Sequence, residues 1–169
     1  MRKTKSGFTI VELLIVIVVI GILAAITIVA YNGFQARAND SRRLQDAANI
    51  QKALALYKVQ NGIYPATAPN PGNSTWEISS DPNFLSSISS ITTAVFKDPQ
   101  HPSKWYWYRK FNAGDFSCPT SMGEFYVLWI DGMQTQSTAK LNDGGCTGQT
   151  LFTTSYLLAH PNMYAYFGF

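Results

Sequence analysis

The chain has few of the side chains that enzyme active sites use. It contains two histidines among 169 residues, and it has neither a Gly-x-Ser-x-Gly nucleophile elbow nor a phosphate-binding loop. His101 and His160 lie far apart in the sequence and each precedes a proline, so we expect surface positions and not a zinc site or a general base. These absences predict a protein that is not an enzyme, that needs no cofactor and that holds no metal.

Acidic residues are absent from the first seven positions, which carry Arg2, Lys3 and Lys5. The formal net charge of +3 comes entirely from these three residues, because removing them leaves ten basic and ten acidic side chains. Binding to nucleic acid depends on an excess of basic residues. The near-neutral remainder of the chain therefore argues against nucleic acid as a partner.

Proline is absent between Phe8 and about Gln60, and glycine occurs there only at Gly21 and Gly33. A stretch of this composition predicts one continuous helix of about 50 residues. Asn61-Gly62 supplies a stop signal for the helix, and Pro65 prevents it from restarting.

The first half of this predicted helix is apolar on all sides. Phe8 to Tyr31 contains one ionisable residue, Glu12, and is longer than the roughly 20 residues that span a hydrocarbon core. The run also exceeds the roughly 7–15 apolar residues of a secretory signal, so an uncleaved signal anchor is the alternative interpretation. The basic residues before it place the N-terminus in the cytoplasm and everything after Tyr31 on the other side of the membrane.

The second half of the helix is amphipathic, and strand signals follow it. Apolar residues recur there at spacings of three and four, at Ala47, Ile50, Leu54 and Tyr57. Trp105 to Phe111 and Glu124 to Asp131 are rich in aromatic and β-branched residues and predict two strands. Further elements are expected at three places: a short helix after Asp81-Pro82, a third strand within Met133 to Leu141, and a last strand or short helix within Leu151 to Leu158. The fold class is therefore α+β, with a long N-terminal helix packed on a small C-terminal antiparallel sheet.

The run Gly7-Phe8-Thr9-Ile10-Val11-Glu12-Leu13 resembles the processing site of the type IV pilin family. Members of that family have a short basic leader, a glycine just before the cut, an aromatic residue just after it and a glutamate five residues into the mature chain. The resemblance continues as far as Asn61-Gly62-Ile63-Tyr64-Pro65, about the first third of the chain.

This resemblance implies how the chain is processed and assembled. A prepilin peptidase would cut between Gly7 and Phe8 and also N-methylate Phe8, and Glu12 would pair with the freed amine of a neighbouring copy. The precursor would span the inner membrane once with its N-terminus in the cytoplasm. An assembly ATPase and a platform membrane protein would then build a helical homo-oligomer, an extracellular filament. Its task, whether twitching, adhesion, DNA uptake or secretion, stays open.

The same resemblance divides the chain into a cleaved leader, a filament-core helix, an amphipathic half-helix and a globular head. Their expected ranges are 1–7, 8–31, 32–61 and 62–169. A minor pilin or a type II secretion or competence pseudopilin would share this processing. A membrane-anchored surface binding protein would keep the helix as its anchor only.

The aromatic run Trp105-Tyr106-Trp107-Tyr108 is a possible surface patch that would stack on carbohydrate or single-stranded nucleic acid. On a strand, the two tryptophans and Arg109 would face one side, and the two tyrosines and Lys110 the other. We expect one set to fill the core under the helix. For the other set, contact with the core or with a neighbouring subunit is favoured over ligand binding.

A calcium loop is a further alternative near the end of the chain. Asn142-Asp143-Gly144 is similar to a fragment of one, but the further carboxylates at alternating positions are missing. A turn is the simpler interpretation.

Cys118 and Cys146 are the only two cysteines, and both lie in the part expected to be exported. In an oxidising compartment such a pair predicts a disulfide. Closing a loop of about 30 residues stabilises a fold by about 2–4 kcal/mol. We therefore expect Cys146→Ser to lower the free energy of unfolding by about that amount, and non-reducing digestion to release a linked peptide pair. Alkylation of both thiols in the native protein would contradict the bridge.

Overall fold

The computed structural model describes residues 7–68, 75–136, 138–142 and 152–169, apart from the side chains of Asn142 and Thr154. The chain divides into two compact units, residues 1–37 and residues 38–169. Helix α1, Ile10–Asn61, is a single helix of 52 residues that contributes to both units. The prediction of one long helix is confirmed.

The helix ends where the sequence predicts. The backbone N–H of Gly62 donates to the carbonyl of Lys58 at 2.8 Å, and Gly62 has a φ of +79°. A residue with a side chain is strained in this left-handed conformation, so glycine is the natural helix terminator here.

The part of α1 in the first unit exposes its apolar side chains. Large apolar residues between Phe8 and Phe34 are half or more exposed at nearly every position, and an 18-residue window of the helix has a mean hydropathy of 3.3. By length and composition, α1 is able to cross a membrane.

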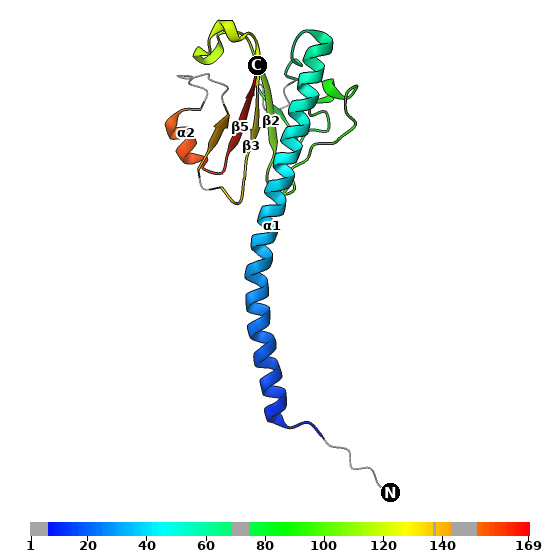
Figure 1. The fold of residues 1–169 in the computed structure, drawn as a ribbon, viewed down its shortest axis with the longest axis vertical. Helices are drawn as coiled ribbons and strands as arrows, with labels where there is room; N and C mark the ends of the chain where they lie inside the picture. Colours follow the sequence, from blue (N-terminus) through cyan, green and yellow to red (C-terminus); the bar gives the residue numbers. More distant parts are fainter. Residues whose placement is uncertain (1–6, 69–74, 137, 143–151) are drawn as a thin grey trace. The chain divides into compact units, whose positions relative to one another are not determined.

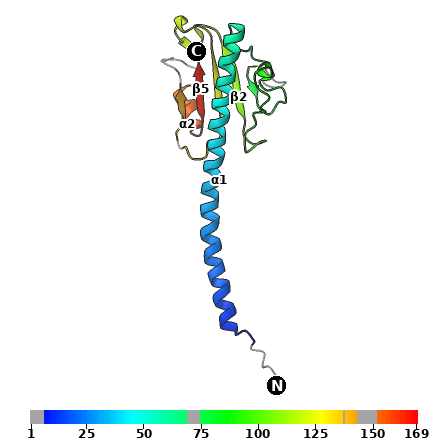
Figure 2. The same cartoon turned by 45° about the vertical axis from the view of Figure 1, so that its right-hand side comes forward.

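The second unit is built on a five-stranded sheet with the order β1-β2-β3-β5-β4. The strands are β1 (Glu77–Ile78), β2 (Tyr106–Phe111), β3 (Phe125–Ile130), β4 (Lys140–Asn142) and β5 (Tyr164–Gly168). Figures 1 and 2 show the cyan part of α1 running along the sheet, with α2 (Thr154–Ala159) beyond β5. The described part of this unit also contains three short 3₁₀ helices: Ser86–Ile88, Asp115–Ser117 and Thr120–Met122.

The sheet is mixed, so the prediction of a purely antiparallel sheet needs correction. Three of its strand pairs are antiparallel, but β4 runs parallel to β5. Parallel neighbours need a crossover connection, which usually contains a helix. Helix α2 lies in the chain between β4 and β5 and belongs to this crossover.

Among the smaller elements, one expectation is confirmed and others need correction. Leu151 to Leu158 contributes a short helix, α2, whose first turn is capped by the Thr153 hydroxyl accepting from the N–H of Tyr156 at 3.2 Å. Within Met133 to Leu141 only the last two residues enter a strand. Strands β1 and β5 were not predicted, since β1 has two residues and β5 lies beyond the last strand signal that was considered.

The sheet has a hydrophobic core on each face. On the inner face, the α1 stripe of Ala47, Ile50 and Leu54 packs with residues from β2 and β3 and is at most 1% exposed. On the outer face, a second cluster joins β3 and β5 to the segment around α2. The predicted packing of the amphipathic half-helix on the sheet is confirmed.

One buried arginine ties α1 to two loops of the second unit. The Arg43 side chain has no exposed surface, and its Nε donates to the Asp98 carboxylate at 2.8 Å. Its Nη1 donates to Asp40 at 2.9 Å, and its Nη2 donates to Gln100 at 2.8 Å. Asp40 also accepts from the backbone N–H and the hydroxyl of Thr135, both at 2.7 Å.

These contacts set the charge state of Asp40. Burial by itself would raise the pKa of the carboxyl, but hydrogen bonds from Thr135, Gln134 and Arg43 outweigh it and hold the pKa below its ordinary value. The resulting stabilisation is complete above the unfolded pKa of about 3.9 and is lost as the pH falls through the lower folded pKa.

Replacing Arg43 tests this cluster. Arg43→Met leaves two buried carboxylates without their cation, so we expect the free energy of unfolding to fall by about 3–5 kcal/mol. Arg42→Met is the matched control, because Arg42 is the exposed neighbour on the same helix and its removal should change stability by about 0.5 kcal/mol or less. Chemical denaturation of the full chain in detergent measures both. Equal effects of the two substitutions would contradict the role of Arg43.

Candidate functional site

In the N-terminal segment, Phe8 is exposed and Thr9 lies at the start of α1. Phe8 is 87% exposed, and α1 begins two residues later. A Cβ at Gly7 would meet no atom within 4 Å. Any requirement for glycine at this position therefore comes from a protein that handles the segment, and not from the fold of this chain.

Glu12 and Thr9 form a capping box. Glu12 Oε2 accepts from the backbone N–H of Thr9 at 2.8 Å and from its hydroxyl at 2.7 Å, while the Glu12 N–H donates to Thr9 Oγ1 at 3.3 Å. Two backbone donors of the first turn are satisfied in this way. The sequence carries the corresponding signal, threonine followed three residues later by glutamate, which the sequence reasoning missed because it treated Glu12 only as a charge.

The capping box leaves one oxygen of the Glu12 carboxylate, Oε1, able to accept a further hydrogen bond. Among the described residues, both hydrogen bonds from Thr9 go to Oε2 and none goes to Oε1. Glu12 is the only ionisable side chain of the apolar run. The carboxylate is thus held in a defined orientation and can still accept from a donor on another molecule.

The aromatic run on β2 divides between the two faces of the sheet. Tyr106 and Tyr108 are at most 1% exposed and lie in the core under α1, so their place in a surface patch was wrong. The expectation that strand alternation sends one set of this run into the core under the helix is confirmed, and the buried set is the two tyrosines. Trp105 and Trp107 are half-buried on the other face.

The remaining predicted site residues fall mostly outside the described part of the chain. Cys118 is buried in the outer-face cluster, but Cys146 lies outside the described residues, so the disulfide stays a prediction. Asp143 and Gly144 lie there too, and the calcium alternative with them. Within the described residues, no group of three or more histidine, cysteine, aspartate or glutamate side chains is placed to hold a metal ion.

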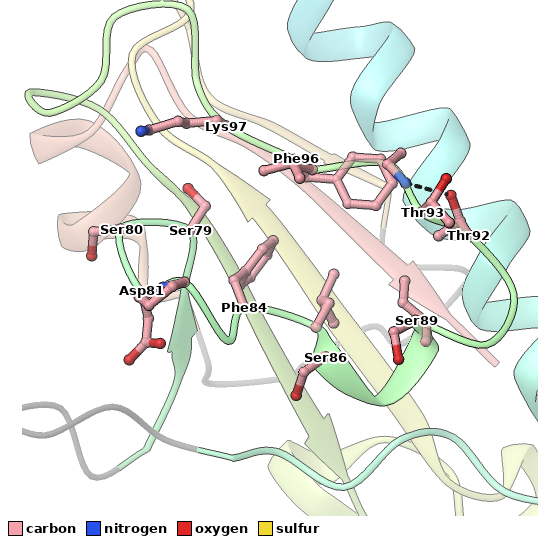
Figure 3. Close-up of a pocket in the computed structure, with 15 residues that line it drawn as sticks. Ser79, Ser80, Asp81, Phe84, Ser86, Ser89, Thr92, Thr93, Phe96 and Lys97 are labelled. Atoms are coloured by element: carbon pink, nitrogen blue, oxygen red, sulfur yellow. Dashed lines mark hydrogen bonds between the residues drawn. The ribbon is translucent and has the colours of Figure 1, made fainter.

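Residues 79–97 enclose an open hollow with a volume of about 590 Å³. Figure 3 shows the ring of Phe84 rising among serine and threonine hydroxyls, with Lys97 pointing away at the edge. Buried Glu77 shapes the hollow by accepting from the N–H of Leu85 at 2.8 Å, and burial raises the pKa of this carboxyl. The lining has no histidine and no cysteine, so it offers a surface for binding and no nucleophile–base pair.

Comparison with known proteins points to the N-terminal segment. Residues 2–28 match the family model of the prokaryotic N-terminal methylation motif. The chain is 35% identical over 66 residues to type II secretion system core protein G of Aeromonas hydrophila, covering 39% of this chain and 46% of that protein. It is 39% identical over 69 residues to the type IV major pilin protein PilE1 of Neisseria gonorrhoeae, covering 41% of this chain and 32% of that protein.

A third relative is the fimbrial protein EcpC of Eikenella corrodens, 39% identical over 66 residues, or 39% of this chain and 43% of that protein. The chain thus spans less than half the length of each of these curated relatives. No solved structure matches it. The resemblance to the type IV pilin family is confirmed, and its relatives include both pilins and secretion-system proteins.

Proposed function

We propose that this chain is a structural subunit of a type IV pilus-like filament. The observation that carries the proposal is the basic segment, Gly7-Phe8 and Glu12 at the head of a long exposed apolar helix, within the match to the methylation-motif model. The pilin and fimbrial relatives support the same conclusion. The secretion-system relatives favour a second candidate, a pseudopilin with the same processing.

Processing would begin at the membrane. The basic residues hold the N-terminus in the cytoplasm, α1 spans the bilayer, and residues after Tyr31 lie outside. A prepilin peptidase cuts between Gly7 and Phe8 and methylates the new amine of Phe8. An assembly ATPase and a platform protein then move the subunit into the filament, where the exposed apolar part of α1 packs with its copies.

Glu12 would couple processing to assembly. In a filament core made of apolar helices, an unpaired carboxylate is costly, and a neighbouring Phe8 amine neutralises it. The amine exists only after the cut, so an uncut subunit cannot make the pair. A subunit displaced along the axis would leave both charges unpaired, and the pair therefore also sets the axial register.

Gly7→Val tests the processing step. A side chain before the cut fills the protease site although it meets nothing in this chain, so we expect uncut protein to accumulate in the membrane and filaments to disappear. Mass spectrometry of the purified N-terminus reads the outcome, and the wild-type chain should begin at a methylated Phe8. Normal filaments from the variant would contradict the proposal, and a wild-type chain retaining its first seven residues would favour the anchored binding protein.

Substitutions of Glu12 test the charge pair. We expect Glu12→Val to be cut and inserted but to enter filaments poorly, and Glu12→Asp to be only partly impaired. Glu12→Gln is the control for helix geometry, because a glutamine preserves the capping box with Thr9 and removes only the charge. If charge is what matters, Glu12→Gln assembles as poorly as Glu12→Val. The measurement is the share of each variant in sheared filaments when it is coexpressed with wild type. Incorporation of Glu12→Val or Glu12→Gln equal to that of wild type would reject the charge pair.

A further inference from the structure

All four tryptophans of the chain lie together in the second unit, on the sheet face opposite α1. Trp107 on β2 is the cross-strand partner of Trp129 on β3, and their rings stack at 5.2 Å with an interplanar angle of 18°. Trp105 meets the ring of Trp107 edge-on at 6.3 Å, and Trp76 meets Trp129 edge-on at 6.1 Å. We call these four residues the tryptophan surface. Each of them is half-buried, so the surface is covered only in part.

An arginine, Arg109, borders this surface. The guanidinium of Arg109 lies 4.8 Å from the ring centre of Phe111 and 6.0 Å from that of Trp76. Among the described residues, Arg109 forms no ion pair, whereas nearby Lys104 pairs with Asp131 at 3.3 Å. A guanidinium stacked on a ring keeps its N–H groups in the plane, where they can donate to a ligand.

Three indole nitrogens of the tryptophan surface find no acceptor among the residues that the structure describes. The Nε1 atoms of Trp105, Trp107 and Trp129 are buried and have no hydrogen-bond partner in the described part of the chain. A buried donor without an acceptor costs free energy, and native proteins contain few of them. Phenylalanine would supply the same stacking without this cost. No acceptor for these donors is found among the described residues, and a bound ligand that carries oxygen acceptors would supply one.

The chemistry of the surface selects a ligand class. Its half-buried rings offer flat apolar faces where they reach the surface, and its indole and guanidinium groups offer only hydrogen-bond donors. A carbohydrate chain presents C–H faces for stacking and hydroxyl and ring oxygens as acceptors. Binding of nucleic acid would need a cluster of cations, whereas Arg109 is the only basic residue in this set of residues and the chain beyond its N-terminal basic residues is near neutral.

We propose that the tryptophan surface, with Arg109, binds a neutral carbohydrate chain. The sugar rings stack on Trp105 and Trp107, and rotation of these half-buried indoles brings their buried N–H groups to the ligand oxygens. Arg109 donates to hydroxyls at the edge of the same sugar. The inference does not rest on filament assembly, because every residue in it belongs to the second unit.

The test is a titration of the purified full chain in a detergent without a sugar headgroup. The probes are cellohexaose and chitohexaose, followed by indole fluorescence and by calorimetry. We expect saturable binding of at least one probe. Trp105→Ala should weaken that binding about tenfold at a temperature where circular dichroism shows the variant to be folded, and Trp105 contacts only Trp107 among the rings of the described residues.

Two further variants complete the test: one separates ring stacking from hydrogen bonding, and the other is a control. Trp105→Phe keeps the stacking and removes the donor, so its loss of affinity should be smaller than that of Trp105→Ala. Ser89→Ala, in the hollow of residues 79–97 away from the tryptophan surface, is the matched control and should bind as wild type does. Three results would each overturn the proposal: no saturable binding of either sugar, binding that Trp105→Ala leaves unchanged, or tryptophan-dependent binding of oligothymidylate without binding of sugar.

Discussion

The packing of one helical stripe on one face of the sheet is the contact on which the second unit depends. Ala47, Ile50 and Leu54 are buried against β2 and β3, and they come from the same helix whose earlier turns expose apolar residues. Near the start of this packed stretch, Arg43 adds a directional contact, because its guanidinium orients carboxylates from α1 and from the loop before β2. Apolar burial supplies most of the attraction, and the ion cluster selects one arrangement of the loops.

The helix start combines a structural and a proposed functional role in a single side chain. Glu12 closes the capping box with Thr9 through one carboxylate oxygen, and the other oxygen accepts nothing from the described residues. A capping glutamate is ordinarily replaceable by glutamine, whereas an assembly charge is not. The two roles are therefore separable by chemistry although they share one residue.

The outer face of the sheet is buried on one side and only half-buried on the other. Toward β5 it is closed by the segment around α2, where Phe152 and Tyr156 pack on Trp129. Toward β1 the side chains of Trp105, Trp107 and Arg109 are only half-buried. A sheet with two apolar faces has to bury both against other elements. Here the segment around α2 buries only part of the outer face. The indole nitrogens of Trp105, Trp107 and Trp129 are buried and have no acceptor among the described residues, which is the physical reason for proposing a ligand there.

The sequence by itself determined the elements whose signals are local. The absence of proline, the Asn61-Gly62 stop and the spacing of three and four along α1 depend only on neighbouring residues, and so do the alternating strands β2 and β3. The processing signature at Gly7-Phe8 and Glu12 is equally local, which is why a family model recognises it. Tertiary structure decided what depends on distant partners. The parallel pairing of β4 with β5, the gathering of Trp76 and Trp129 with Trp107, and the burial of Arg43 bring together residues far apart in the sequence. Each depends on a chain crossover or a shared face, and no local pattern encodes which distant residue will stand opposite.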